Sequence, residues 1–202
     1  MKKETRPDFM WHLDAVVIPF PVAIVTTVDA EGRVNAAPFG LILPFNSSPG
    51  NPQILLCSNR RWHTARNIAE TGEFVINYAP FRLVGPAALT GLTYDDGVNE
   101  IEKANLTAIP ALKVTPPRIQ ECFQHIECRL NRIIRPSEYQ DNFIGDVLAV
   151  TLDEELTALP REERLKAADP LLLYGIDITS FEGNYAGVGA TVRYKPPVTD
   201  TE

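Results

Sequence analysis

The chain has 202 residues, 45% of them hydrophobic, and a formal net charge of −7 at pH 7. This length suits one domain with a substantial core, and we expect a single domain over residues 1–202, with its core at about 15–180. The net negative charge disfavours nucleic acid as a partner, because a phosphate backbone needs a basic surface. No apolar run approaches the roughly 20 residues of a membrane span, and the charged amino terminus does not suit a secretory signal. We therefore expect a cytoplasmic protein that does not contact a membrane.

The three cysteines and three histidines argue against disulfides and against a metal site. Cys57, Cys122 and Cys128 form neither a CxxC pair nor a zinc-ligand spacing, and an odd count disfavours a disulfide framework. We expect reduced, mostly buried thiols. The histidines are scattered and form no helical pair, so we predict no metal ion.

The first strong pattern along the chain is a β-hairpin. A β-branched run at residues 22–28 is followed by a turn at 29–33, and residues 34–37 return as the partner strand. The turn contains a glycine, which supplies a positive φ, and an aspartate, which readily bonds its own backbone. Another strand is predicted at 53–58, after a loop rich in proline, glycine, asparagine and serine at 44–52.

The clearest helix is predicted at residues 64–71, where apolar residues recur at i, i+3 and i+4. Thr64 is positioned to cap its start, and Gly72 stands where a helix end takes a left-handed residue. A further strand is predicted at 74–78.

The second half of the sequence indicates more strands than helices. A short helix is predicted at 100–104, after which three prolines break the chain into extended pieces. Long strands are predicted at 122–134 and 143–152, and residues 156–168 indicate a charged surface helix or loop. Six or more strands, few irregularly placed helices and no internal repeat favour an antiparallel β-barrel with helical insertions.

A candidate anion site lies at the start of the predicted 64–71 helix. Three arginines, Arg60, Arg61 and Arg66, stand there among the polar residues Ser58, Asn59, His63, Thr64 and Asn67. Guanidinium groups, hydroxyl donors and free helix amides together form the kind of site that phosphate occupies. Taken alone, arginines before a helix also serve to solvate a surface.

A second candidate site is the hairpin itself. Small residues after the turn leave backbone exposed beside one amide side chain, Asn35. Small side chains let a flat ligand lie against main-chain donors and acceptors. Ordinary hairpin packing is the alternative interpretation.

The order and spacing of these segments resemble the flavin-reductase-like, FMN-binding split-barrel family. The matching segments are PVAIVTT at 21–27, GRVNAAP at 32–38, HTARNI at 63–68, TGEFVIN at 71–77, GVNEIEKANL at 97–106 and FIGDV at 143–147. The resemblance covers about residues 15–180.

This resemblance implies an antiparallel Greek-key split β-barrel with a few short helices. It also implies that bound FMN is lined at its isoalloxazine ring by Thr26, Thr27, Asn35, Ala36 and Ala37. By the same resemblance, the ribityl phosphate is held by Ser58, Arg60, Thr64 and Asn67. Members of the family are usually homodimers with flavin near the subunit interface, and we expect the strand at residues 16–25 to bury surface between two subunits as well as inside one.

The implied activity is that of an FMN-binding oxidoreductase, in which NAD(P)H is the electron donor and flavin or another small molecule is the acceptor. Catalysis would belong largely to the flavin, so no catalytic side chain is assigned. Two alternatives stay open: a non-catalytic flavin-binding electron carrier, and a split barrel that binds deazaflavin or pyridoxal phosphate.

Overall fold

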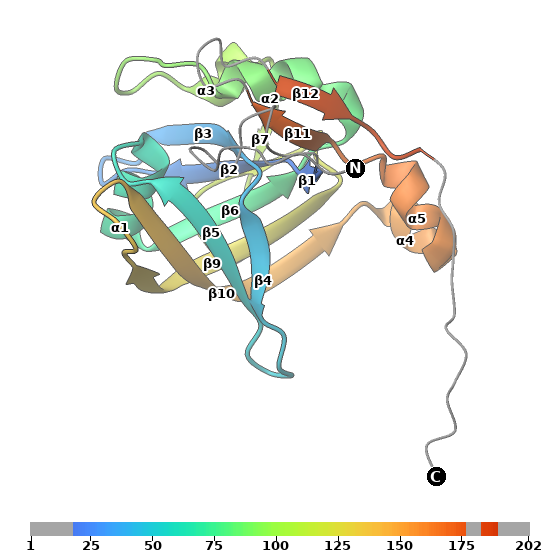
Figure 1. Ribbon diagram of the computed structural model, residues 1–202, viewed down its shortest axis with the longest axis horizontal. Coiled ribbons are helices and arrows are strands. Elements are labelled where there is room, and N and C mark those ends of the chain that lie inside the picture. The colour runs from blue at the N-terminus through green and yellow to red at the C-terminus, as the bar shows by residue number, and fades with distance from the viewer. Residues whose placement is uncertain (1–17, 177–182, 190–202) are drawn as a thin grey trace, which may run out of the picture.

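The computed structural model describes residues 18–176 and 183–189 and is mainly β. Seven antiparallel strands form one curled sheet, a half barrel, in the order β3-β2-β6-β9-β10-β5-β4 (Figure 1). These strands are β2 (Ala23–Val28), β3 (Val34–Phe39), β4 (Ile42–Asn46), β5 (Gln53–Asn59), β6 (Glu73–Tyr78), β9 (Gln124–Ile134) and β10 (Gln140–Leu152). The predicted antiparallel barrel with few helices is confirmed.

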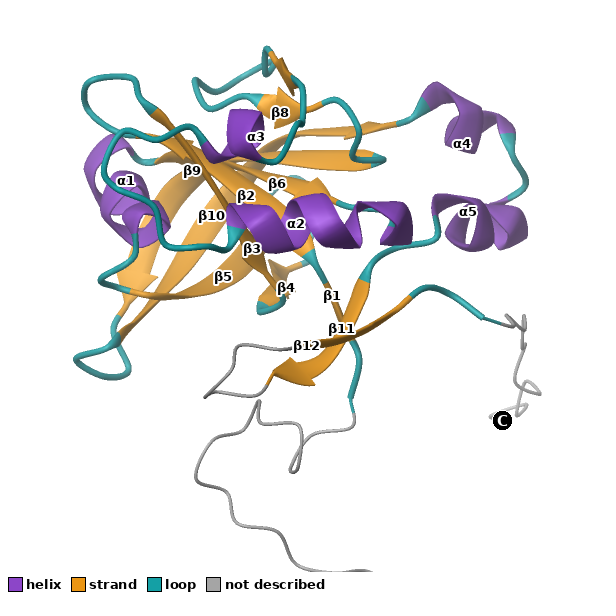
Figure 2. Ribbon diagram, turned by 90° about the horizontal axis from the view of Figure 1, so that it is seen from above, coloured by secondary structure: helices purple, strands orange, loops and turns teal. Residues whose placement is uncertain are grey.

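Smaller elements surround this sheet. Three short strands form a second sheet and two more form a ribbon: β1 (Phe20–Pro21), β11 (Leu172–Ile176) and β12 (Gly183–Ala186), then β7 (Ala108–Ile109) and β8 (Arg118–Ile119). The helices are α1 (His63–Thr71), α2 (Val84–Thr90), α3 (Glu100–Lys103), α4 (Glu154–Ala158) and α5 (Arg161–Ala168), with a 3-10 turn η1 (Phe81–Leu83) before α2. In Figure 2, α2 and α3 lie over β2 and β3, whereas α4 and α5 lie apart from the sheet. No helix in the described ranges is both long and apolar enough to cross a membrane.

The two edge strands of the large sheet, β3 and β4, are consecutive in the chain. Only Gly40 and Leu41 separate them. Three Cα steps span at most about 10 Å, whereas the edges of a flat seven-stranded sheet would lie about 29 Å apart. The sheet must therefore curl until its two edges approach each other.

Strand β2 is buried on both faces, which explains its uninterrupted apolar run. Its inward residues join the core of the half barrel, which consists of Ala23, Val25, Phe39, Ile42, Ile54, Leu56, Ala65, Ile68, Phe74, Ile76, Cys128 and Phe143. Its outward residues join a second core under α2 and α3, which consists of Val22, Ile24, Ala36, Ala79, Leu83, Ala87, Ile101, Ala104, Leu106, Ile119, Cys122 and Leu171. Two of the three cysteines are thus buried, as expected.

The predicted hairpin and helix are confirmed, with one correction at the helix start. Gly32 has φ +80°, and the Asp29 carboxylate accepts hydrogen bonds from the Glu31 and Arg33 amides. Gly72 ends α1 in the left-handed conformation, as predicted. The prediction that Thr64 caps this helix is wrong. The N-cap is Trp62, which has no side-chain cap bond, and the Thr64 hydroxyl accepts a hydrogen bond from the hairpin instead.

Several elements were not predicted. The expected loop at 44–52 begins inside β4, because Pro44 is tolerated on an edge strand. Helix α2 contains a glycine and a proline, two residues that weaken the sequence signal of a helix. The helix still forms, because a proline in the first helical turn costs no hydrogen bond. The charged segment at 156–168 forms two short helices, α4 and α5, with a proline before the second.

The expectation that residues 16–25 bury surface between subunits, as well as inside one, stays a prediction. Within the described part of this segment, Ile18 is 61% exposed. Ala23, Ile24 and Val25 are fully buried within one chain, so they have no surface left to give to a partner. Val16 and Val17 lie outside the described residues.

Gly145 on β10 generates a test of barrel packing. A Cβ at this position would lie 2.6 Å from a ring carbon of Phe74, which is fully buried in the barrel. We expect Gly145→Ala to lower the free energy of unfolding by about 1–3 kcal/mol, because an overpacked core must shift. Chemical denaturation measures this change.

Gly85→Ala is the matched control. Gly85 lies in α2, where a Cβ would contact nothing within 4 Å, so alanine should raise the free energy of unfolding by about 0.5–1 kcal/mol. Equal effects of the two substitutions would contradict the tight packing at Gly145.

Candidate functional site

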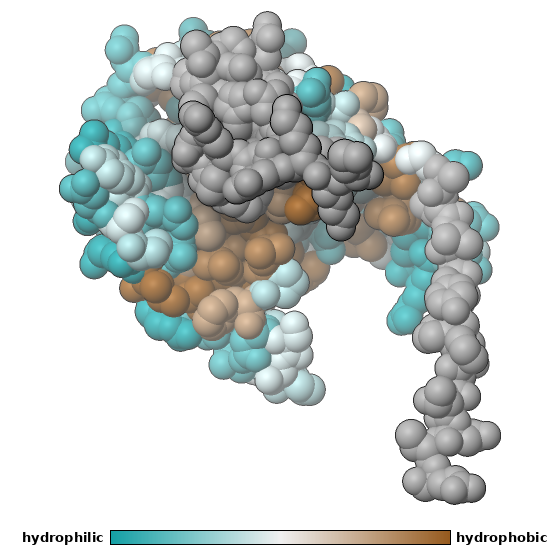
Figure 3. Space-filling view, viewed as in Figure 1, coloured by the Kyte–Doolittle hydropathy of each residue, from teal (hydrophilic) through white to brown (hydrophobic). Residues whose placement is uncertain are grey.

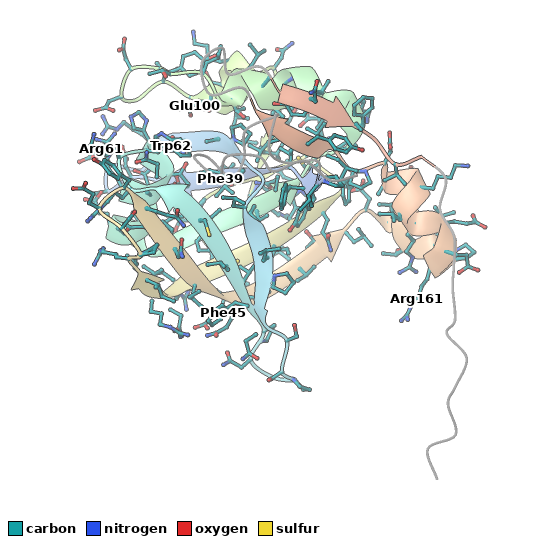
Figure 4. The ribbon with its side chains drawn as sticks, in the orientation of Figure 1. Phe39, Phe45, Arg61, Trp62, Glu100 and Arg161 are labelled. Atoms are coloured by element: carbon teal, nitrogen blue, oxygen red, sulfur yellow. The ribbon has the colours of Figure 1, made fainter. Side chains whose placement is uncertain are left out.

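A cleft of about 300 Å³ lies beside β3, between the start of α1 and the loop that follows α2. Among the described strands only β2 pairs with β3, so the other edge of β3 is free to face a ligand. The cleft is lined by Asn35, Ala36, Ala37, Pro38, Arg61, Trp62, His63, Thr64, Thr90, Gly91, Leu92, Thr93, Tyr94 and Glu100. Figure 4 shows Arg61, Trp62 and Glu100 on the same side of the molecule. The volume is at the lower end of that of small-molecule sites.

A buried polar network joins the hairpin to α1 behind this cleft. The Asn35 side-chain amide donates to the Thr27 hydroxyl at 3.2 Å and to the Thr64 hydroxyl at 3.0 Å. The Asn67 amide donates to the same Thr27 hydroxyl at 3.0 Å. These four side chains fix the start of α1 against β2 and β3, so the cleft has a rigid wall.

The amino terminus of α1 opens onto the cleft without a side-chain cap. The first bond of the helix runs from the Arg66 amide to the Trp62 carbonyl, which leaves the preceding helical amides free of intrahelical partners. Such amides carry partial positive charge and bind anions. The Trp62 ring packs edge-on against Phe39, with centroids 6.0 Å apart, and is 55% exposed.

Four of the nine residues assigned from the sequence line the cleft, namely Asn35, Ala36, Ala37 and Thr64. Thr27 lies behind them in the polar network, and Asn67 borders a smaller neighbouring cleft of about 170 Å³. Thr26 faces the opposite side of the sheet, where its hydroxyl donates to the Pro117 carbonyl at 2.5 Å. Thr26 and Thr27 differ in this way because successive residues of a strand point to opposite faces of the sheet.

Ser58 and Arg60 do not line either cleft. Ser58 is buried on β5 directly opposite Asp141, and the Arg60 Nε lies 4.0 Å from the Asp141 carboxylate. The neighbouring Arg61 lines the cleft instead, with its guanidinium 5.5 Å from the ring centroid of Tyr139.

The main residue that sequence reasoning missed is Glu100. It is 5% exposed, and its Oε2 accepts a hydrogen bond of 3.0 Å from the Ala36 amide, at the edge of the cleft. Burial raises the pKa of this carboxyl above its ordinary value. Its segment was part of the family resemblance, but nothing in the sequence shows that α3 folds back onto β3.

The loop between α2 and α3 was also missed as a part of the site. Asp96 in this loop lies 2.8 Å from the His63 Nε2 and 3.4 Å from the Arg66 guanidinium, so it ties the loop to α1. Leu92 and Tyr94 from the same loop line the cleft.

Comparison with known proteins fits this geometry. The flavin reductase like domain matches residues 15–180. The chain belongs to the flavin-reductase-like family. The resemblance inferred from the ordered segments is confirmed.

Three solved structures show the same fold as this flavin-reductase-like chain. Nitrilotriacetate monooxygenase component B from Bacillus cereus is 26% identical, with a TM-score of 0.80 over 96% of this chain and 98% of the other. Flavoredoxin of Desulfovibrio vulgaris (Miyazaki F) is 26% identical, with a TM-score of 0.76 over 96% and 97% of the two chains. A flavin reductase with a split barrel domain from Shewanella frigidimarina is 20% identical, with a TM-score of 0.76 over 89% and 87%. The fold is thus a split barrel.

Proposed function

We propose that this flavin-reductase-like protein is an FMN-dependent oxidoreductase that takes electrons from NAD(P)H and passes them to flavin or another small acceptor. The observation that supports it is one cleft in which a free strand edge of small residues meets an uncapped helix terminus and an arginine. A flat ring and a terminal phosphate need these two surfaces next to each other.

The residues of the cleft fit FMN. The short side chains of Ala36 and Ala37 would let a flat ring approach the backbone of β3. Gly91 packs closely on Pro38, since a Cβ at Gly91 would lie 3.0 Å from that ring. The α1 terminus and Arg61 suit the phosphate dianion, since charge-assisted bonds to phosphate are strong. Pyridoxal phosphate would share only the phosphate end, whereas a deazaflavin would share the flat tricyclic ring as well.

Bound FMN would supply two-electron redox chemistry between NAD(P)H and the acceptor. The protein would supply orientation and electrostatics. Asn35 and Thr64 hold the wall that the ring would face, and Trp62 and Leu92, both more than half exposed, line the cleft.

Flavin titration tests this proposal directly. We expect the purified protein to bind FMN with a dissociation constant below about 10 μM, which corresponds to roughly −7 kcal/mol. Flavin fluorescence and absorbance measure it. An FMN-loaded protein that consumes NAD(P)H without any added protein is a reductase, whereas one that does not is an electron carrier. Absence of FMN binding below that concentration contradicts the proposal.

The adjacent arginines test the phosphate end. Because Arg61 lines the cleft and Arg60 lies beside Asp141, we expect Arg61→Ala to weaken FMN about tenfold and Arg60→Ala to weaken it less. Riboflavin, which lacks the phosphate, serves as the control ligand and should lose little affinity for either variant. Equal losses for FMN and riboflavin would show that these arginines act elsewhere.

We also propose that the protein works as a homodimer. Leu43 and Phe45 on edge strand β4 are 54% and 44% exposed, and Figure 3 shows apolar residues gathered over β4 and β5. Monomeric proteins rarely expose such patches without a partner. A second copy of the chain on this face would bury the exposed side chains of β4.

Sedimentation of the FMN-loaded protein at micromolar concentration tests assembly. We expect a species of twice the 22.4 kDa chain mass, which Leu43→Lys should convert to the monomer. Leu165→Lys is the matched control, because Leu165 is 53% exposed on α5, away from the sheet. A wild-type monomer that retains FMN would rule out the dimer.

A further inference from the structure

Glu100 is a buried carboxyl that borders both clefts. It lines the 300 Å³ cleft beside β3 and also the 170 Å³ cleft between the β2–β3 hairpin and α1. With 5% of its surface exposed, it has lost most of its contact with bulk water. A ligand in the larger cleft would therefore lie close to a carboxyl that water screens only weakly.

The position of the carboxyl is fixed by the edge of β3. Its Oε2 accepts a hydrogen bond from the Ala36 amide, at 3.0 Å, where the sheet offers no further strand. Helix α3, whose first residue is Glu100, packs against both β3 and α2. The carboxyl group thus sits at the residue whose backbone, by the proposed function, lies against the flavin ring.

Among the described residues, no lysine, arginine or histidine nitrogen forms an ion pair with the Glu100 carboxylate within 4 Å. His63 is near enough to favour the charged form of Glu100, but burial outweighs this effect and raises the pKa. Helix α2 has no ionisable side chain. The charged groups around it are paired with others: Arg33 with Asp29 and Glu31 in the hairpin, and His63 and Arg66 with Asp96. Glu70, at the far side of the smaller cleft, is exposed. A desolvated, unpaired carboxylate acts strongly on any charge that develops nearby.

A flavin changes charge when it is reduced. The oxidised ring is neutral, and a hydride adds a negative charge to it unless a further proton is taken up. We propose that Glu100 is a specificity-determining residue of the flavin cleft: its carboxylate makes the cleft bind reduced FMN less tightly than oxidised FMN. This inference rests on the proposed function. It gives the protein a physical means to release reduced flavin to an acceptor.

Glu100→Gln tests the charge and keeps the hydrogen bond, because the glutamine side-chain oxygen still accepts from the Ala36 amide. The dissociation constants of oxidised and anaerobically reduced FMN are measured at pH 8 for the wild type and the variant. We expect the variant to bind reduced FMN about tenfold more tightly relative to oxidised FMN. The midpoint potential of the bound flavin should rise by about 30 mV, the two-electron equivalent of that factor.

Glu102→Gln is the matched control, since Glu102 lies on the same helix but is exposed. It should leave both dissociation constants unchanged. A pH series on the wild type gives an independent measurement. Because burial raises the pKa of Glu100, the carboxyl takes up a proton at a higher pH than an ordinary glutamate, and protonation removes its charge. The potential of bound flavin should then rise relative to that of free flavin as the pH falls, and this rise should be absent in Glu100→Gln.

The outcomes separate the two proposals. Equal changes in both dissociation constants in Glu100→Gln, or a wild-type potential that tracks that of free flavin at every pH, overturn the role of Glu100 alone. A wild type that binds neither form of FMN overturns the proposed function as well.

Discussion

Two residues, Gly40 and Leu41, connect opposite edges of the seven-stranded sheet, and this short connection forces the sheet to curl. A curled sheet has an inside, which the barrel core fills, and an outside, which α2 and α3 cover over β2 and β3. Among the described strands, β3 pairs only with β2, and the cleft lies beside it.

The sequence revealed those parts of the fold whose signals are local. The hairpin from 22 to 37, the helix that ends at Gly72 and the long strands β9 and β10 all show a period, a turn residue or a cap. The missed elements have no such signal. Strand β4 contains a proline that only its edge position tolerates, and the short strands β11 and β12 form through pairing across the chain.

The candidate site divides in the same way. Asn35, Ala36, Ala37 and Thr64 were identified from the sequence and line one cleft, because the hairpin and the helix start that carry them are locally determined. Side chains alternate between the two faces of β2, so Thr26 points away from the cleft, toward Pro117. A family resemblance alone does not reveal this orientation. Glu100 and the loop with Asp96 reach the site only through tertiary packing.

The cleft is lined by groups of both signs. The uncapped terminus of α1 and Arg61 attract an anion. Arg60 adds less to that attraction, because the buried Asp141 carboxylate lies within reach of both Arg60 and Arg135. Glu100 lines the same cleft and holds its carboxyl beside Ala36. By the proposed function, the phosphate dianion would lie toward Arg61 and the neutral ring toward Glu100, since a dianion beside that carboxylate is disfavoured. The same asymmetry that orients the oxidised ligand would weaken the hold on its ring once that ring becomes negative, so binding in one redox state and release in the other can follow from a single fixed carboxyl.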